Sequence, residues 1–239
     1  MKKIGLLDWK WILIAGLLSS FFPSFFFALA QTQLDSGVTS IFNSVVPLFT
    51  TIVGLGLFGA IVTKRQIAGV FIGLFGTLIL ILTGMEFDPD KNYWYSVFIL
   101  MSAIGYALNI NIIKKHLAHL SPLAVTTGSF AVAVVPAIVV VFYSGFFSEI
   151  GKNVNMQNSM WYLLALAVLG TAIANIYFNK LIHLSSPVFA ASVTYTIPLV
   201  AVLWGVWDGE TLNIYQLTGG LVILFGVYLV NRKKVLHNK

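Results

Sequence analysis

Polar and helix-bending side chains recur at helical spacing inside two long apolar segments. Asn43, Pro47, Thr50 and Gly54 fall on one face of a helix. A proline removes one backbone donor and crowds the preceding turn, so a carbonyl becomes free to accept other hydrogen bonds. These residues could bind a solute through neutral hydrogen-bonding groups.

The same spacing returns near the other end of the chain. Thr194, Pro198, Ala201 and Gly205 take the corresponding positions, and Tyr195 lies beside them. Further polar side chains stand in other apolar segments, where lipid cannot satisfy them. They must face other helices or a water-filled cavity, so packing is the alternative to solute binding. The candidate cavity-lining residues are Asn43, Pro47, Tyr106, Asn109, Asn175, Thr194, Tyr195 and Pro198.

Catalytic motifs are missing from the sequence. His116, His119, His183 and His237 stand near segment ends without metal-ligand spacing, and the chain has no cysteine and no phosphate-binding loop. Ser186 beside Pro187 is best explained as a helix cap. We therefore expect no enzyme activity, no metal and no cofactor.

The elements that carry these residues are apolar helices. Of the 239 residues, 58% are hydrophobic and only 9% are charged. This composition indicates an all-α polytopic membrane protein rather than a soluble one. Eight segments are long enough to cross a bilayer as helices, near 11–31, 37–60, 66–84, 93–113, 122–147, 160–182, 186–207 and 214–231.

The charged residues lie outside the centres of these segments and are distributed unevenly. If the segments alternate in direction, twelve of the 14 Lys and Arg residues fall on one side. By the positive-inside rule both termini are cytoplasmic, in a plasma or inner membrane. The net charge of +6 is thus explained by topology and the lipid bilayer, without a nucleic-acid partner.

Residues 11–76 and 161–226 resemble each other as two copies of one segment. An odd number of spans separates their starts, so the copies face opposite ways, as in many secondary transporters. Gly69 and Gly73, with Gly219 and Gly226 in the second copy, indicate close helix packing. The boundaries predicted are a first repeat at 1–84, an extracytoplasmic linker at 85–92 and a second repeat at 93–239.

The second repeat has two helices that find no counterpart in the first. Only ten residues precede Trp11, too few for a helix pair. We therefore expect an incomplete five-plus-five helix arrangement in which the sequence begins at an internal methionine. The alternative is a natural form that has lost these helices.

The segment from Ile176 to Val230 resembles the second half of EamA-type transporters of the drug/metabolite transporter superfamily. Pro198, Glu210, Gln216, Gly219 and Gly226 occupy the positions of the family pattern, whereas Gly59 and Ala60 stand where the first repeat would carry the glutamate. The resemblance implies a secondary transporter that exports small metabolites or drugs by alternating access. The alternative is a non-transporting accessory or degenerate membrane protein derived from this family.

Overall fold

The computed structural model describes residues 4–34, 36–83, 91–149, 154–207 and 214–231. Within these ranges every regular element is a helix, and seven helices are long and apolar enough to cross a membrane. A shorter apolar helix, Pro187–Val200, stands in the seventh expected segment. The prediction of an all-α polytopic membrane protein is therefore confirmed. Most of the expected linker at 85–92 lies outside the described residues. Glu210 lies outside them as well.

The chain forms two compact units, and each combines stretches that are far apart in the sequence. The first unit consists of Met1–Phe22 and Ile112–Ser185, and the second consists of Pro23–Asn111 and Ser186–Lys239. Each unit thus takes helices from both halves of the chain.

The first unit is built around contacts between its N-terminal helix and α7. Its elements are α1 (Leu6–Gly16), the π-helical segment η1 (Leu17–Phe21), α7 (Pro122–Tyr143), α8 (Phe146–Glu149), α9 (Val154–Ala165), the π-helical segment η3 (Leu166–Ile173) and α10 (Ala174–Leu184). A β-carbon on Gly16 would lie 2.6 Å from the carbonyl oxygen of Ser129, so the two helices approach backbone to backbone. Between the expected segments 122–147 and 160–182, the chain is already helical from Val154.

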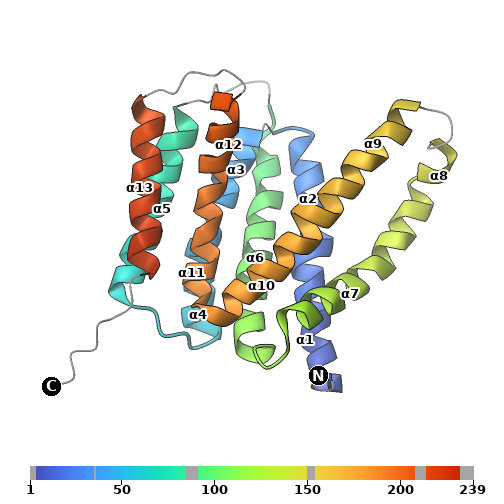
Figure 1. Cartoon of the computed structure of the whole chain (residues 1–239), viewed down its shortest axis with the longest axis horizontal. Helices are drawn as coiled ribbons and strands as arrows, with labels where there is room; N and C mark the ends of the chain where they lie inside the picture. Colours follow the sequence, from blue (N-terminus) through green and yellow to red (C-terminus); the bar gives the residue numbers. More distant parts are fainter. Residues whose placement is uncertain (1–3, 35, 84–90, 150–153, 208–213, 232–239) are drawn as a thin grey trace. The chain divides into compact units, whose positions relative to one another are not determined.

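The second unit holds most of the remaining helices (Figure 1). They are α2 (Phe22–Gln31), α3 (Ser36–Asn43), α4 (Val46–Leu57), α5 (Lys64–Leu82), the 3-10 turn η2 (Tyr93–Tyr95), α6 (Ser96–His116), α11 (Pro187–Ser192), the 3-10 turn η4 (Val193–Tyr195), α12 (Thr196–Trp207) and α13 (Ile214–Asn231). Helix α6 enters the first unit after Asn111.

Helices α5 and α13 pack side by side through glycines, as expected (Figure 1). A β-carbon on Gly226 would lie 2.5 Å from the backbone nitrogen of Gly73, and one on Gly69 would lie 2.7 Å from the carbonyl oxygen of Gly226. Only residues without side chains allow helix backbones to come this close. This helix pair therefore packs backbone against backbone.

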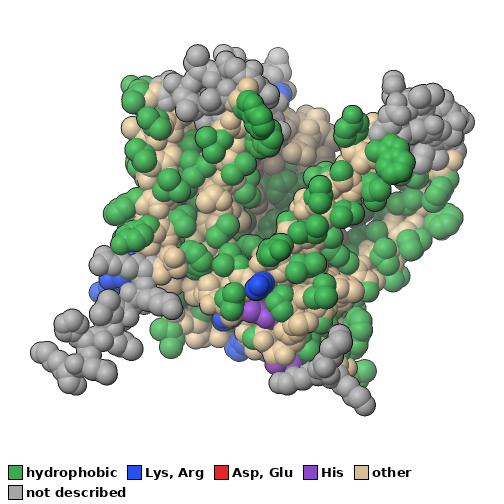
Figure 2. All heavy atoms as spheres, in the orientation of Figure 1, with side chains coloured by type: hydrophobic (Ala, Val, Ile, Leu, Met, Phe, Trp, Pro, Cys, Tyr) green, Lys and Arg blue, Asp and Glu red, His purple; other side chains and the backbone are tan. Residues whose placement is uncertain are grey.

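Apolar side chains cover the outer faces of the helices. Figure 2 shows hydrophobic side chains along the helices, with Lys, Arg and His side chains near helix ends. On α5, Phe71 and Phe75 are exposed, whereas Gly73 and Thr77 on the other face are buried. Such a surface suits contact with lipid tails.

Two irregularities recur at equivalent places in the repeats. The π-helical segment η1 in the first copy corresponds to η3 in the second, and the break between α3 and α4 corresponds to the turn η4 between α11 and α12. Local departures from the α-helix therefore occur at matched positions of the two similar segments.

Candidate functional site

The first break separates α3 from α4 in the second unit. Helix α3 ends at Asn43, and Pro47 stands in the first turn of α4. Because Pro47 has no N–H, it cannot donate to the carbonyl of Asn43, and the helix cannot continue undisturbed. The Ser44 amide closes α3 by donating to the Ser40 and Ile41 carbonyls at 3.0 and 3.1 Å. The predicted bend near Pro47 is therefore a true interruption.

Hydroxyl groups satisfy the backbone around this break. The Thr50 hydroxyl donates to the carbonyl of Val46, and the Thr51 hydroxyl donates to that of Pro47, each at 2.8 Å. The Ser44 hydroxyl donates to Ile41 at 2.6 Å. Helix α4 therefore begins with its first carbonyls already engaged by local side chains.

The second break joins α11 to α12 through the 3-10 turn η4, three residues before Pro198. Tyr195 in this turn is fully buried, and its hydroxyl donates to the carbonyl of Val70 on α5 at 2.9 Å. Its ring fills the space in front of Gly73, where a β-carbon would lie 2.7 Å from the ring atoms. Tyr195 therefore holds the break against α5. Pro198 is buried in α12. The Thr194 hydroxyl donates to the backbone carbonyl of Ala191 at 2.8 Å.

Helix α6 contributes two candidates to the same unit. The ring of Tyr106 lies 6.3 Å from that of Phe27, centroid to centroid. Asn109 is only 6% exposed, and its side-chain oxygen Oδ1 is buried without a hydrogen-bond partner. The carboxamide oxygen of Asn43 on α3 is likewise buried and unpartnered.

Asn111 is a residue that the sequence reasoning missed. Its Nδ2 donates to the carbonyl of Thr50 on α4 at 3.1 Å and to Ala107 on its own helix at 2.9 Å. Its Oδ1 lies against Gly54, where a β-carbon would be 2.9 Å away. Asn111 thus fixes α6 to α4 just beyond the first break. The signal that could have revealed it was the glycine at position 54, which leaves room for a long side chain from a neighbouring helix.

The eighth candidate, Asn175, lies in the first unit. It stands at the start of α10, directly after η3, and its Nδ2 donates to the Thr171 carbonyl at 2.9 Å. The structure thus brings seven of the eight candidates into the second unit and leaves Asn175 in the first.

The first unit has polar contacts of its own. Asn179 on α10 donates to the hydroxyl of Thr126 on α7 at 2.8 Å, and both side chains are buried. The Lys114 ammonium donates to the carbonyls of Ile182 and His183 at 3.1 and 2.9 Å, and so caps the end of α10. A cation at a helix C-terminus is favoured by the helix dipole. These contacts tie helices together and need no ligand.

The start of α1 is held by two histidines. The Nε2 atom of His119 lies 3.1 Å from a carboxylate oxygen of Asp8, and the ring of His116 stacks on Trp11 at 3.8 Å between centroids. No group of three or more His, Asp or Glu side chains within the described ranges is placed to hold a metal ion.

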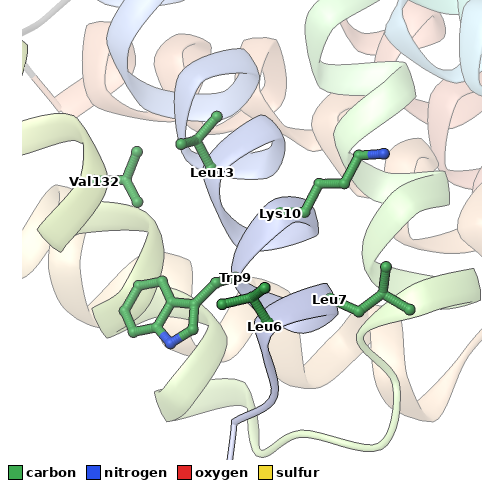
Figure 3. Close-up of a pocket in the computed structure, with 6 residues that line it drawn as sticks. All are labelled: Leu6, Leu7, Trp9, Lys10, Leu13 and Val132. Carbon is green, nitrogen blue, oxygen red and sulfur yellow. The ribbon is translucent and has the colours of Figure 1, made fainter.

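A surface hollow of about 620 Å³ lies beside α1 in the first unit (Figure 3). Figure 3 shows Trp9 and Leu13 on the side of Val132, with Lys10 extending in another direction. Its walls are apolar apart from Lys10, so the hollow offers no convergent set of polar groups for a polar solute. We therefore place the candidate site at the first helix break instead.

Comparisons with known proteins show the family of the chain. The sequence profile of the EamA-like transporter family matches residues 1–82 and 93–232. The uncharacterized inner membrane transporter YedA of Escherichia coli K12 is 31% identical over 208 residues, which cover 85% of this chain and 64% of YedA. An uncharacterized transporter of Archaeoglobus fulgidus is 22% identical over 98% of this chain and 81% of its own length.

One solved crystal structure has a similar fold. It superposes with a TM-score of 0.70 at 16% identity and covers 91% of this chain and 75% of its own. The chain spans slightly less than two thirds of the length of YedA, 64%.

Proposed function

Because this chain belongs to the EamA-like transporter family, we propose that it is a secondary transporter of small metabolites or drugs in the inner or plasma membrane. We propose further that it exports its solute by alternating access, with both termini cytoplasmic. The absence of acidic and basic side chains from the centres of the apolar segments favours a neutral or zwitterionic solute.

The observation that carries this proposal is the pair of helix breaks at equivalent positions of an inverted repeat. Interrupted helices expose backbone groups and polar side chains at membrane depth, which is tolerated only inside protein or along a cavity. In secondary transporters such breaks form the solute site. The seven candidates of the second unit form the proposed site, with Asn43 and Asn109 as its polar side chains and Tyr195 as the residue that positions the second break. Asn175, in the first unit, stays a separate prediction.

The test compares solute release from bacterial cells that express the full-length chain with release from cells that carry an empty vector. Mass spectrometry of the medium identifies solutes whose release depends on the chain. We expect the double variant Asn43→Leu with Asn109→Leu to reduce this release at least about tenfold, because each lost hydrogen bond weakens binding by about 1 kcal/mol or more.

The matched control is Thr218→Val, a polar-to-apolar change at an exposed position of α13. It should release solute as the wild type does at equal membrane levels. If the wild type releases nothing beyond the empty vector, the chain is a non-transporting member of the family. If the double variant matches the wild type, the proposed site is wrong.

A further inference from the structure

One face of α1 is exposed, although the helix packs on α7 along another side. Its residues recur at the spacing of a single helical face: Leu6, Trp9, Lys10 and Leu13. Leu6 is 92% exposed, and Trp9 and Leu13 are exposed as well. The chain therefore presents a mainly apolar surface with one lysine at the start of this helix.

Val132 of α7 borders this face, and together they form the surface hollow of about 620 Å³ (Figure 3). The hollow lies beside a close contact of the two helices. Gly128 stands one turn before Val132, and a β-carbon there would lie 2.8 Å from a side-chain carbon of Ile12. A molecule in the hollow would thus touch both α1 and α7. Its volume is in the range of about 300–1,000 Å³ that is usual for small-molecule sites.

The surroundings of the hollow belong to the membrane. Helix α1 begins the candidate membrane span Leu6–Gln31. Apolar walls are better covered by hydrocarbon than by water. Trp9 stands in the first turns of this span, and tryptophans near span ends are typical of the headgroup level of a bilayer. The walls therefore fit a lipid acyl chain.

The charged residue at the hollow is Lys10. Figure 3 shows its side chain directed away from Trp9 and Val132, and its Nζ lies 5.8 Å from the ring centroid of Trp11. The nearest acid in the sequence, Asp8, stands about 200° around α1 from Lys10. Its carboxylate accepts from the Gly5 amide at 2.9 Å and lies 3.1 Å from His119. The Lys10 ammonium is therefore left to pair with an anion from outside the chain.

We propose that this hollow binds one anionic phospholipid, with an acyl chain along Leu6, Trp9 and Val132 and with the headgroup phosphate on Lys10. The long lysine stem allows the ammonium to reach the headgroup level. In the proposed orientation this end of α1 meets the cytoplasmic leaflet, whose anionic lipids attract basic side chains. The lipid bridges α1 and α7 and stabilises the first unit, whereas the proposed solute site lies in the second unit.

The test counts the lipids that remain bound to the purified full-length chain in native mass spectrometry. Phosphatidylglycerol and phosphatidylcholine with identical acyl chains are added in equal series, so that only the net charge and chemistry of the headgroup differ. We expect one phosphatidylglycerol to bind in a saturable way, with an apparent affinity about fivefold above that of phosphatidylcholine. It should also raise the melting temperature. Equal retention of both lipids would overturn the inference.

A lysine variant decides whether the headgroup contact is at Lys10. Lys10→Gln keeps a polar side chain and removes the charge, so it should lower the affinity for phosphatidylglycerol about fivefold. The matched control is Lys180→Gln, which removes an exposed lysine from α10 of the same unit and should leave the affinity unchanged. If both variants lower the affinity equally, the lipid responds to the total charge of the chain and the site is wrong.

A valine variant decides whether the acyl chain lies in the hollow. Val132→Phe fills part of the hollow and should lower the affinity for both lipids. The control Val135→Phe adds the same ring at a position of α7 that is 64% exposed, so binding should match the wild type. Unchanged phosphatidylglycerol binding in Val132→Phe would contradict the inference.

A last series replaces the lipid with inorganic phosphate at equal ionic strength. Phosphate should not raise the melting temperature in a saturable way, because it lacks the acyl chain that fills the hollow. A saturable rise equal to that with phosphatidylglycerol would show that Lys10 binds a free anion, and the docked lipid would be ruled out.

Discussion

At the scale of single residues, the reach of a polar side chain decides what it does in these helices. Short Thr and Ser hydroxyls bond back to carbonyls of their own helix, as Thr50 and Thr51 do. The longer carboxamide of Asn111 bonds to a carbonyl of its own helix and also reaches a neighbouring helix. Asn43 and Asn109 have the same reach, and their oxygens remain unpartnered. This contrast separates the residues that hold the structure from those that are proposed to bind solute.

Tyr195 offers a test of the structural role at this scale. Tyr195→Phe removes the hydrogen bond to Val70 and leaves the packing of the ring against Gly73 intact. We expect a loss of about 1 kcal/mol in the free energy of unfolding, measured by titration with a denaturing detergent. Tyr228→Phe at an exposed position of α13 is the control and should change stability little. Equal stability of both variants would show that the Tyr195 hydroxyl does not hold the break.

At the scale of elements, the proline positions explain where helices are interrupted, and the glycines explain where they meet. Pro47 and Pro198 stand just after the break in each copy, so the sequence alone predicts a bend there. It does not predict that one break becomes a turn between two helices and the other a 3-10 turn. The 3-10 turn also carries a contact that is remote in sequence, the hydrogen bond from Tyr195 to Val70 of α5.

The packing of α5 on α13 predicts a sharp difference between two glycine substitutions. Gly226→Ala places a methyl group against the backbone of Gly73 and should destabilise the chain by about 1–3 kcal/mol. Gly56→Ala adds the same methyl group where nothing lies within 4 Å, so we expect a change of less than about 0.5 kcal/mol. Detergent-induced unfolding of both variants measures the difference. A tolerated Gly226→Ala would contradict the close helix approach.

At the scale of the whole molecule, the charge asymmetry predicts how the chain crosses the membrane. The sequence has no cysteine, so single cysteines report on one position each. In intact cells a membrane-impermeant maleimide should label Lys91→Cys, at the expected outer side. It should label Lys115→Cys, at the expected cytoplasmic end of α6, only after the cells are permeabilised. The reverse pattern would invert the proposed orientation.

The sequence by itself determined the class of the protein and much of its plan. Apolar segments of membrane-spanning length and a repeated pattern around Pro47 and Pro198 follow from local composition and spacing, which need no tertiary contacts to be recognised. For the same reason the glycines of α5 and α13 predicted close packing, and the structure confirms it.

Only the tertiary structure decided which polar groups are already used. Tyr195 finds a partner on α5, whereas Asn43 and Asn109 keep buried oxygens without partners. A hydrogen bond between residues far apart in the chain depends on how helices pack, and helical spacing in one segment cannot specify it. The equivalent positions of the repeat look alike in sequence, and long-range contacts make the first break the stronger candidate for the site.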